Sequence, residues 1–355
     1  MNTNLTDKKY VPLYCVWELT LQCNLRCLHC GSRAGKKREH ELSSAEALNV
    51  ADELITLGCT HVSLIGGEVF FYSRWEEIAR KLSDNGLTVN VITNGYLMEE
   101  PQIREILYAG LSNVAISIDG LEEHHNKIRN NAASFSRLCT SIDRLNEHSI
   151  PVAVNTTLMR ENFEDLDGLY TFLTDKGVAV WQLQLANPMG NLKAQNDKLI
   201  TPGQMRELTT FIRNKRSERK ISIYTGDNIG YYDSNEEYIR GTPGSAGCWQ
   251  GCQAGLTGIG IDSVGNVKGC ESLYDDRFIE GNIRNESLSH IWQKDGNFSY
   301  NRNFTPDKLE GKCRGCSMGQ LCRAGCRGAC YFTNGGLFEN AYCTYSHTVP
   351  FSETQ

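Results

Sequence analysis

The stretch Leu21-Gln22-Cys23-Asn24-Leu25-Arg26-Cys27-Leu28-His29-Cys30 places three cysteines with the spacing C-x3-C-x2-C on one short loop, just after the first apolar run. Three thiolates at this spacing can hold three corners of a cubane [4Fe–4S] cluster, which normally takes four. The fourth iron would then be open to a substrate. Zinc sites favour C-x2-C pairs with a partner pair downstream, so the spacing favours an iron–sulfur cluster over a zinc knuckle or a redox pair.

The composition is that of an ordinary globular protein. The 355 residues suit one large domain plus a smaller one, with 40% hydrophobic and 22% charged residues and a formal net charge of −6. That charge gives no reason to expect nucleic acid. No apolar stretch approaches the ~20 residues of a membrane helix, and residues 1–9 lack a signal peptide's apolar core. We therefore expect a cytoplasmic protein, in which fifteen cysteines indicate metal binding rather than disulfides.

Apolar runs alternate with amphipathic stretches from Val11 to about Tyr224. Six strand–helix units in sequence predict a parallel sheet wrapped by helices, either an open doubly wound sheet or a partial barrel. In both cases the site should lie at the carboxyl ends of the strands. The predicted strands cover residues 13–19, 62–65, 88–92, 114–118, 152–156 and 180–185, and the predicted helices cover 45–57, 74–84, 102–109, 135–147, 163–176 and 205–219.

Short polar motifs follow several of these strands. Gly66-Gly67-Glu68 comes directly after the second strand, where adjacent glycines allow a close backbone approach that a Cβ would block. Ser117-Ile118-Asp119-Gly120 ends the fourth strand, so its polar groups should point into the barrel mouth. Asn94-Gly95 ends the third strand and has the signature of a turn. Gln182 and Gln184 near the end of the sixth strand either line a substrate cavity or are ordinary barrel residues.

Together these motifs resemble the radical S-adenosylmethionine (SAM) superfamily. The resemblance implies a partial (β/α)6 TIM-type barrel whose cluster, held by Cys23, Cys27 and Cys30, binds SAM and cleaves it reductively to a 5′-deoxyadenosyl radical. It further implies that His29 packs near the adenine of SAM, where the family usually has another ring. Gly66, Gly67 and Glu68 would cradle the ammonium group of SAM. Val69 follows them in place of the family's usual proline. Ser117 and Asp119 would lie near the ribose and carboxylate. Arg129 would pair with that carboxylate.

A second field of cysteines lies between Cys248 and Cys343, where nine of the fifteen fall among glycines, arginines and short strand-like pieces. Residues 258–261 and 266–268 predict a hairpin, and residues 288–292 predict a short helix. So few apolar residues would make a weak core without metal. Zinc remains the alternative for this half.

This field resembles the SPASM extension of radical SAM enzymes, a small cysteine-rich α+β domain that carries two auxiliary [4Fe–4S] clusters. By that resemblance one cluster takes Cys248, Cys252, Cys270 and Cys326, and the other takes Cys313, Cys316, Cys322 and Cys343. Three clusters use eleven cysteines and leave four over. Cys15, Cys59 and Cys139 should be core residues, while Cys330 either replaces Cys326 as a ligand or is a spare thiol.

We therefore expect an N-terminal tail over residues 1–10, a barrel over 11–225, a bridging region over 226–247 and an auxiliary-cluster domain over 248–355. The resemblance implies an oxygen-sensitive radical SAM/SPASM oxidoreductase. Our first expectation is a maturase of a ribosomally made peptide with a flavodoxin or ferredoxin as reductant. The alternatives are an enzyme acting on tetrapyrrole side chains, an anaerobic sulfatase-maturing enzyme, or a non-enzymatic iron–sulfur or zinc protein.

Two features of such a maturase stay open in the sequence. Only about ten polar residues precede the first strand, so leader recognition would fall to the barrel, to the bridge near 187–198 or to a separate leader-binding partner. No residue is identifiable as the catalytic acid or base.

Overall fold

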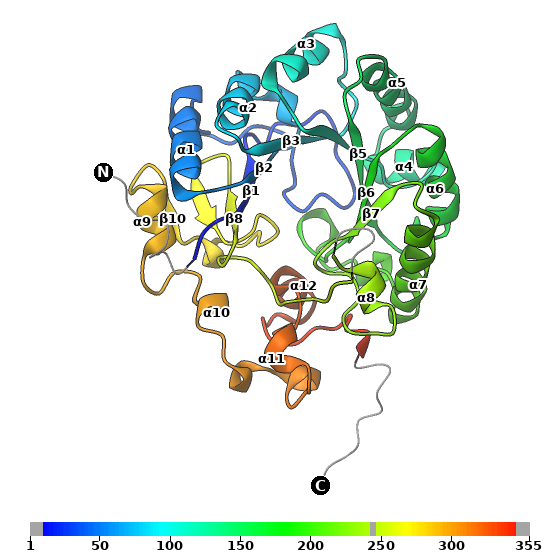
Figure 1. Cartoon of the computed structure of the whole chain (residues 1–355), viewed down its shortest axis with the longest axis vertical. Helices are drawn as coiled ribbons and strands as arrows, with labels where there is room; N and C mark the ends of the chain where they lie inside the picture. The colour runs from blue at the N-terminus through cyan, green and yellow to red at the C-terminus, as the bar shows by residue number, and fades with distance from the viewer. Residues whose placement is uncertain (1–9, 242–245, 346–355) are drawn as a thin grey trace.

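The computed structural model describes residues 10–241 and 246–345, and the described strands form one curved sheet (Figure 1). Its order is β10-β9-β8-β1-β2-β3-β4-β5-β6-β7, so the two edges are β10 and β7 and the barrel is partial. The run from β1 to β7 is parallel throughout. The parallel strands are β1 (Tyr14–Glu18), β2 (His61–Ile65), β3 (Thr88–Thr93), β4 (Asn113–Ser117), β5 (Val152–Leu158), β6 (Val180–Leu185) and β7 (Ser222–Thr225).

A ring of helices covers the outer face of this sheet (Figure 1). Capping boxes start two of these helices: Ser43 pairs with Glu46 in one, and Thr201 pairs with Gln204 in the other. All six predicted strand–helix units are confirmed, so the α/β partial-barrel prediction is correct. The helices of this half are α1 (Ser44–Leu57), α2 (Trp75–Asp84), α3 (Glu100–Ala109), α4 (Glu122–Arg129), α5 (Ser134–Glu147), α6 (Leu166–Asp175) and α7 (Pro202–Glu218).

Two elements of the barrel were not predicted. Strand β7 has only four residues, Ser222–Thr225, and follows the charged run that ends at Lys220. Helix α4 has the sequence EEHHNKIR, in which Ile128 is the sole aliphatic residue, so it shows no apolar period. Both elements form because tertiary contacts bury them, which local patterns do not reveal.

The cysteine-rich half adds to the barrel's own sheet. Strand β8 (Gly258–Ile261) pairs in parallel with β1, in a register that joins Tyr14 to Gly258, and forms the predicted hairpin with β9 (Asn266–Lys268). Strand β10 (Gly281–Asn282) follows at the edge. The predicted helix near 288–292 is α9, and Figure 1 shows α11 and α12 below the gap between β8 and β7. The helices are α8 (Glu236–Ile239), α9 (Leu288–Gln293), α10 (Ser299–Arg302), α11 (Gly319–Cys322) and α12 (Arg327–Asn334).

The two faces of the parallel strands have different environments. One face, which includes Trp17, Leu64 and Leu183, belongs to the main apolar core under the helices. The alternate residues face the lumen of the barrel and are half-buried, as in the row Ser117, Asn155 and Gln182. Within residues 10–241 and 246–345, no helix is both long and apolar enough to cross a bilayer.

Candidate functional site

The three cysteines of the first loop lie together beyond the carboxyl ends of β1 and β2. Burial, with smaller contributions from Glu68, Cys27 and Cys30, raises the pKa of the Cys23 thiol to about 11. Main-chain N–H groups point at two of the sulfurs, from Leu25 to Cys23 at 3.4 Å and from Ala34 to Cys30 at 3.3 Å. Such donors stabilise thiolates and cluster ligands. The loop therefore fits the three-cysteine cluster that the sequence predicts.

The two glycines after β2 pack against this loop. The N–H of Gly67 donates to the carbonyl of Thr20 at 2.7 Å, and that of Glu68 donates to the carbonyl of Gln22 at 2.7 Å. A Cβ on Gly67 would lie 2.4 Å from the carbonyl oxygen of Gln22, which no packing tolerates. The backbone that comes close to these glycines is therefore that of the cysteine loop itself.

Glu68 links β2, β3 and the loop. Its fully buried carboxylate accepts a hydrogen bond from the Thr93 hydroxyl at 2.7 Å and another from the Asn94 N–H at 2.8 Å. Burial raises its pKa to about 7 although these donors lower it. The Asn94 amide then donates to the side chain of Asn24 at 2.8 Å and lies 3.8 Å from the Cys23 sulfur. Asn94, which the sequence marked only as a turn, is therefore a site residue.

Three of the predicted SAM contacts form one buried network with the loop. Asp119 Oδ2 lies 2.6 Å from His29 Nε2 and 2.6 Å from Arg129 Nη2. Arg129 Nη1 lies 3.8 Å from the Cys27 sulfur, and Arg129 Nε is buried without a hydrogen-bond partner. Ser117 stands on the lumen face opposite Asn155. The arginine expected to face a ligand carboxylate is thus also the partner of Asp119.

The segment after β6 holds the other side of the loop. The Asn191 side chain donates to the Cys27 carbonyl at 2.9 Å, and its main-chain N–H donates to the Cys30 carbonyl at 3.0 Å. Gly190 adopts a positive φ of 55°, and a Cβ there would lie 2.2 Å from the Cys30 carbonyl oxygen. The bridge that the sequence offered for leader recognition therefore contacts the cysteine loop.

The second predicted set of auxiliary cysteines converges in the structure. Cys313, Cys316, Cys322 and Cys343 all line one small hollow of about 20 Å³. Burial raises the pKa of Cys313 to about 11, with Cys343 and Cys316 adding to the shift, and it raises that of Cys322 further still. Mutual repulsion of this kind is what a positively charged metal centre relieves.

The first predicted set is less complete. Burial, Cys252 and Cys270 all raise the pKa of Cys326, so these three thiols are neighbours. Cys248 is exposed, and its sulfur accepts a hydrogen bond from Gln250 at 2.9 Å. Across the described residues, no three His, Cys, Asp or Glu side chains are grouped as they would be around a single metal ion.

The remaining cysteines lie mostly in the core. Cys15 and Cys59 are buried in the main apolar core, and Cys139 packs against it, as predicted. Cys330 on α12 is fully buried and donates to the carbonyl of Ala324 at 3.0 Å. Burial raises its pKa to about 12, and both Cys313 and Cys252 add to this shift, so it lies between the two auxiliary sets.

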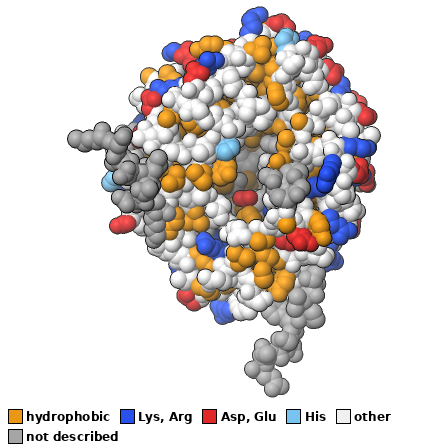
Figure 2. Space-filling view, in the orientation of Figure 1, with side chains coloured by type: hydrophobic (Ala, Val, Ile, Leu, Met, Phe, Trp, Pro, Cys, Tyr) orange, Lys and Arg blue, Asp and Glu red, His pale blue; other side chains and the backbone are white. Residues whose placement is uncertain are grey.

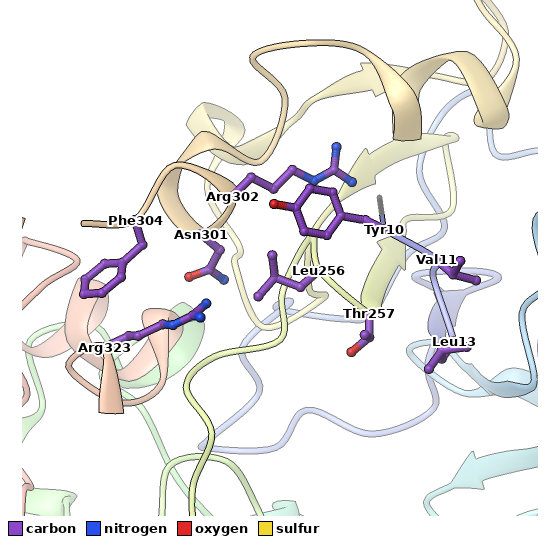
Figure 3. A pocket seen from close by; sticks show the side chains of 9 residues that line it. All are labelled: Tyr10, Val11, Leu13, Leu256, Thr257, Asn301, Arg302, Phe304 and Arg323. Atoms are coloured by element: carbon purple, nitrogen blue, oxygen red, sulfur yellow. The ribbon is translucent and has the colours of Figure 1, made fainter. Parts of the chain in front are cut away.

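A separate hollow of about 290 Å³ lies at the amino ends of β1 and β8 (Figure 3). Leu13, Thr257 and Asn301 contribute to its lining, and the aromatic ring of Tyr10 stands over it beside Arg302. None of the predicted site residues reaches it. The site described above instead belongs to the opposite, carboxyl-terminal face of the barrel. Figure 2 shows that the molecule is hollowed near the centre of the barrel.

A parallel barrel with three converging thiols at its mouth and two further thiol groups beside it defines a class of iron–sulfur enzyme. The chain matches the model of the radical SAM superfamily over residues 17–173 and that of an iron–sulfur cluster-binding domain, SPASM, over residues 252–317. It is 29% identical to the AdoMet-dependent heme synthase of Methanosarcina barkeri over 94% of this chain and 97% of that protein. It is 26% identical to mycofactocin maturase MftC of Mycolicibacterium smegmatis, over 91% of this chain and 80% of that protein.

Solved structures agree on the fold. SuiB of Streptococcus suis bound to S-adenosylmethionine superposes with a TM-score of 0.75 at 16% identity, over 94% of this chain and 77% of that one. The structure of anSMEcpe with bound AdoMet and a Cp18Cys peptide superposes with a TM-score of 0.70 at 20% identity, over 95% of each chain. The protein belongs to the radical SAM superfamily and is an enzyme of that class with a C-terminal SPASM domain.

Proposed function

We propose that this enzyme matures a ribosomally made peptide by abstracting a hydrogen atom from it, and that it carries three [4Fe–4S] clusters. The SAM-binding cluster would be held by Cys23, Cys27 and Cys30. The similarity to mycofactocin maturase and to the sporulation killing factor maturation protein of Bacillus subtilis supports a peptide substrate. The observation that carries the proposal, however, is the chemistry of the lumen.

The lumen is lined by neutral hydrogen-bonding side chains. Ser117, Asn155, Gln182 and Tyr224 form one continuous row across four strands, and all four are half-buried. The next layer toward the mouth pairs Gln184 with Thr157, whose side chains lie 3.0 Å apart. Amides and hydroxyls of this kind both donate and accept, which suits the backbone and neutral side chains of a peptide.

The parallel strands that form the wall of the lumen carry no basic side chain other than His61. None of the residues of β1 to β7 is lysine or arginine. Their one acidic residue, Glu18, is fully buried and hydrogen-bonded to Arg38 and Tyr274. A buried anion without a counter-charge is costly, so a substrate with several carboxylates would find little support inside the barrel. This favours a peptide over a tetrapyrrole.

The reaction balances as a net two-electron oxidation. A [4Fe–4S] cluster and SAM, held by Cys23, Cys27 and Cys30, would supply a radical that takes one hydrogen atom from the peptide and would consume one electron and one SAM. When the peptide radical closes a carbon–carbon, carbon–sulfur or carbon–oxygen bond, one proton and one electron leave it. We infer that the electron passes to an auxiliary cluster and that a flavodoxin or ferredoxin donates the electron that starts each turnover.

This chain's own residues would orient the cofactor and the substrate. Arg129, with its unpartnered Nε, and Asp119 stand beside Cys27, where a zwitterionic amino acid group could be bound. Gln182 and Gln184 would hold the peptide in the lumen. Recognition of any leader segment would fall to the barrel rim, since Gly190 and Asn191 of the bridge contact the cysteine loop, or to a separate partner protein.

A tetrapyrrole substrate is the second candidate, because heme synthases are similar to this chain over nearly its whole length. The test is an anaerobic assay with SAM and dithionite. A short ribosomally made precursor peptide supplied as the substrate should lose two hydrogen atoms by mass, and 5′-deoxyadenosine should form. Conversion of a carboxylated tetrapyrrole in place of the peptide would overturn the proposal.

Iron and sulfide analysis tests the cluster count independently. The reconstituted enzyme should bind about twelve irons, and a variant with Cys23→Ala, Cys27→Ala and Cys30→Ala should bind about eight and form no deoxyadenosine. Zinc in place of iron, with SAM left intact, would exclude the radical mechanism.

A further inference from the structure

One residue of the segment after β6 binds the main chain of two cysteines in the first loop. The side-chain amide of Asn191 donates to the Cys27 carbonyl at 2.9 Å, and its main-chain N–H donates to the Cys30 carbonyl at 3.0 Å. Both cysteines are proposed ligands of the SAM-binding cluster. Asn191 follows Cys27 by 164 residues, so the two segments meet only through the fold.

The peptide group between Cys27 and Leu28 is held at both ends. Its carbonyl accepts the hydrogen bond from the Asn191 side chain, and its N–H, that of Leu28, donates to the carbonyl of Ile128 at 2.8 Å. A trans peptide group is planar, and its C=O and N–H point in opposite directions, so two partners on opposite sides leave it one orientation. That orientation fixes the neighbouring Cα atom, and therefore the position from which the Cys27 thiol extends.

The segment that carries Asn191 is itself anchored. Residues Gly190–Leu192 form a short 3₁₀ turn, and Arg33 Nη2 donates to the Gly190 carbonyl at 2.9 Å. Leu192 is fully buried in a small apolar cluster that is separate from the main core and also contains Ile128. The donor and the acceptor that hold the Cys27 peptide group therefore rest on one packed support, which resists displacement. The cluster consists of Ile128, Met159, Ala186, Leu192 and Leu199.

We propose that Asn191 is a positioning residue for the SAM-binding cluster: as a hydrogen-bond donor to the Cys27 and Cys30 carbonyls, it sets the orientation of their peptide groups and the spacing of their thiols. The inference rests on the first cluster of the proposed function. Groups that orient the ligands of a metal centre typically control its affinity or activity by about 10-fold to 100-fold. The role depends on the donor and not on the size of the side chain, which makes it testable with an isosteric variant.

The test compares full-length variants after anaerobic reconstitution. Asn191→Ala removes the donor to Cys27 but keeps the main-chain bond to Cys30, so about four irons per chain should pass to a chelator about tenfold faster than in the wild type. Asn191→Asp keeps the size of the side chain but sets a carboxylate oxygen against the Cys27 carbonyl, and release should be about a hundredfold faster. In both variants the electron paramagnetic resonance spectrum of the reduced protein with SAM should change, while about eight auxiliary irons stay bound.

Asn196→Asp is the matched control, since Asn196 is exposed on the same segment and the change adds the same charge; it should behave like wild type. If Asn191→Asp keeps wild-type iron release and spectrum, or is milder than Asn191→Ala, the donor does not position the loop and the assignment is overturned. Loss of the auxiliary irons in both Asn191 variants would show a general structural role and would equally contradict it. A wild-type protein that binds zinc and no iron would instead refute the first cluster itself, so the two failures are distinguishable.

Discussion

The ring nitrogen Nε2 of His29 lies 2.6 Å from Oδ2 of Asp119, joining the cysteine loop to the end of β4. The same oxygen binds Arg129, and the other carboxylate oxygen accepts the N–H of Thr157 at 2.9 Å. Burial alone would raise the pKa of Asp119, but Arg129 and His29 lower it well below its ordinary value. The carboxylate therefore stays ionised at neutral pH and holds three segments of the site together.

Asp119→Asn should destabilise the protein by about 3 kcal/mol, because the buried Arg129 would lose its counter-charge. Chemical unfolding of the anaerobic protein at neutral pH measures this change. Asp143→Asn is the matched control: Asp143 pairs with Lys176 at 2.7 Å on the surface, where such pairs contribute less than about 1 kcal/mol. Equal losses in the two variants would contradict the network described here.

His125 should make the folded protein sensitive to mild acid. Its Nδ1 accepts the N–H of Asp119 at 3.1 Å and its Nε2 lies 3.0 Å from the Ser134 hydroxyl, which fits a neutral ring. Burial, with help from Arg129, lowers its pKa to about 3. Below about pH 6.5 the unfolded chain takes up a proton that the folded chain refuses, so stability falls as the pH falls, by about 1.4 kcal/mol per unit.

Unfolding free energies at about pH 7.5 and pH 5.5 measure this contribution. The wild-type protein should lose about 1 kcal/mol more than His125→Gln over that interval. The exposed His148 provides the control, since His148→Gln should keep the wild-type dependence. An unchanged slope in His125→Gln would show that another group carries the effect.

Gly67→Ala should displace the cysteine loop and lower the iron content. The added methyl group would meet the carbonyl oxygens of Gln22 at 2.4 Å and Leu21 at 2.5 Å, both main-chain atoms that cannot rotate away. We expect a loss of up to about four irons per chain and of deoxyadenosine formation. Gly203→Ala, at the start of α7 and with no atom nearer than 3.7 Å, should behave like wild type. Full iron content in Gly67→Ala would refute the packing argument.

Much of this site could be predicted because its parts follow strand ends. In a parallel sheet, residues after neighbouring strands meet at one edge, so Glu68 and Asp119 were expected beside the cysteine loop and lie there. Each also carries a local signal: two adjacent glycines precede Glu68, and Asp119 is a polar residue at the end of an apolar run. The C-x3-C-x2-C spacing is likewise local.

The residues that were missed act through distant contacts. Asn94 sits before a glycine and looks like a turn, and only the fold brings its amide to Asn24, 70 residues earlier. Asn191 carries no local signal either, and only the fold brings its side-chain amide to the carbonyl of Cys27, 164 residues earlier. The parallel pairing of β8 with β1 similarly joins residues at opposite ends of the chain. No local sequence signal predicts these contacts between distant segments.

The neutral lumen yields the sharpest test of the substrate class. Gln182 is half-buried between Asn155 and Tyr224, so Gln182→Lys places a cation in the middle of the amide row. A neutral peptide should then bind at least about tenfold more weakly, seen as a raised KM, because an ammonium group there must be desolvated. Cleavage of SAM without peptide should be unchanged, since Gln182 belongs to the wall and not to the cysteine loop. The exposed Gln293 on α9 supplies the control Gln293→Lys, which should keep the wild-type KM. If Gln182→Lys instead leaves peptide turnover intact, or confers activity on a carboxylated tetrapyrrole, the lumen does not select neutral peptides.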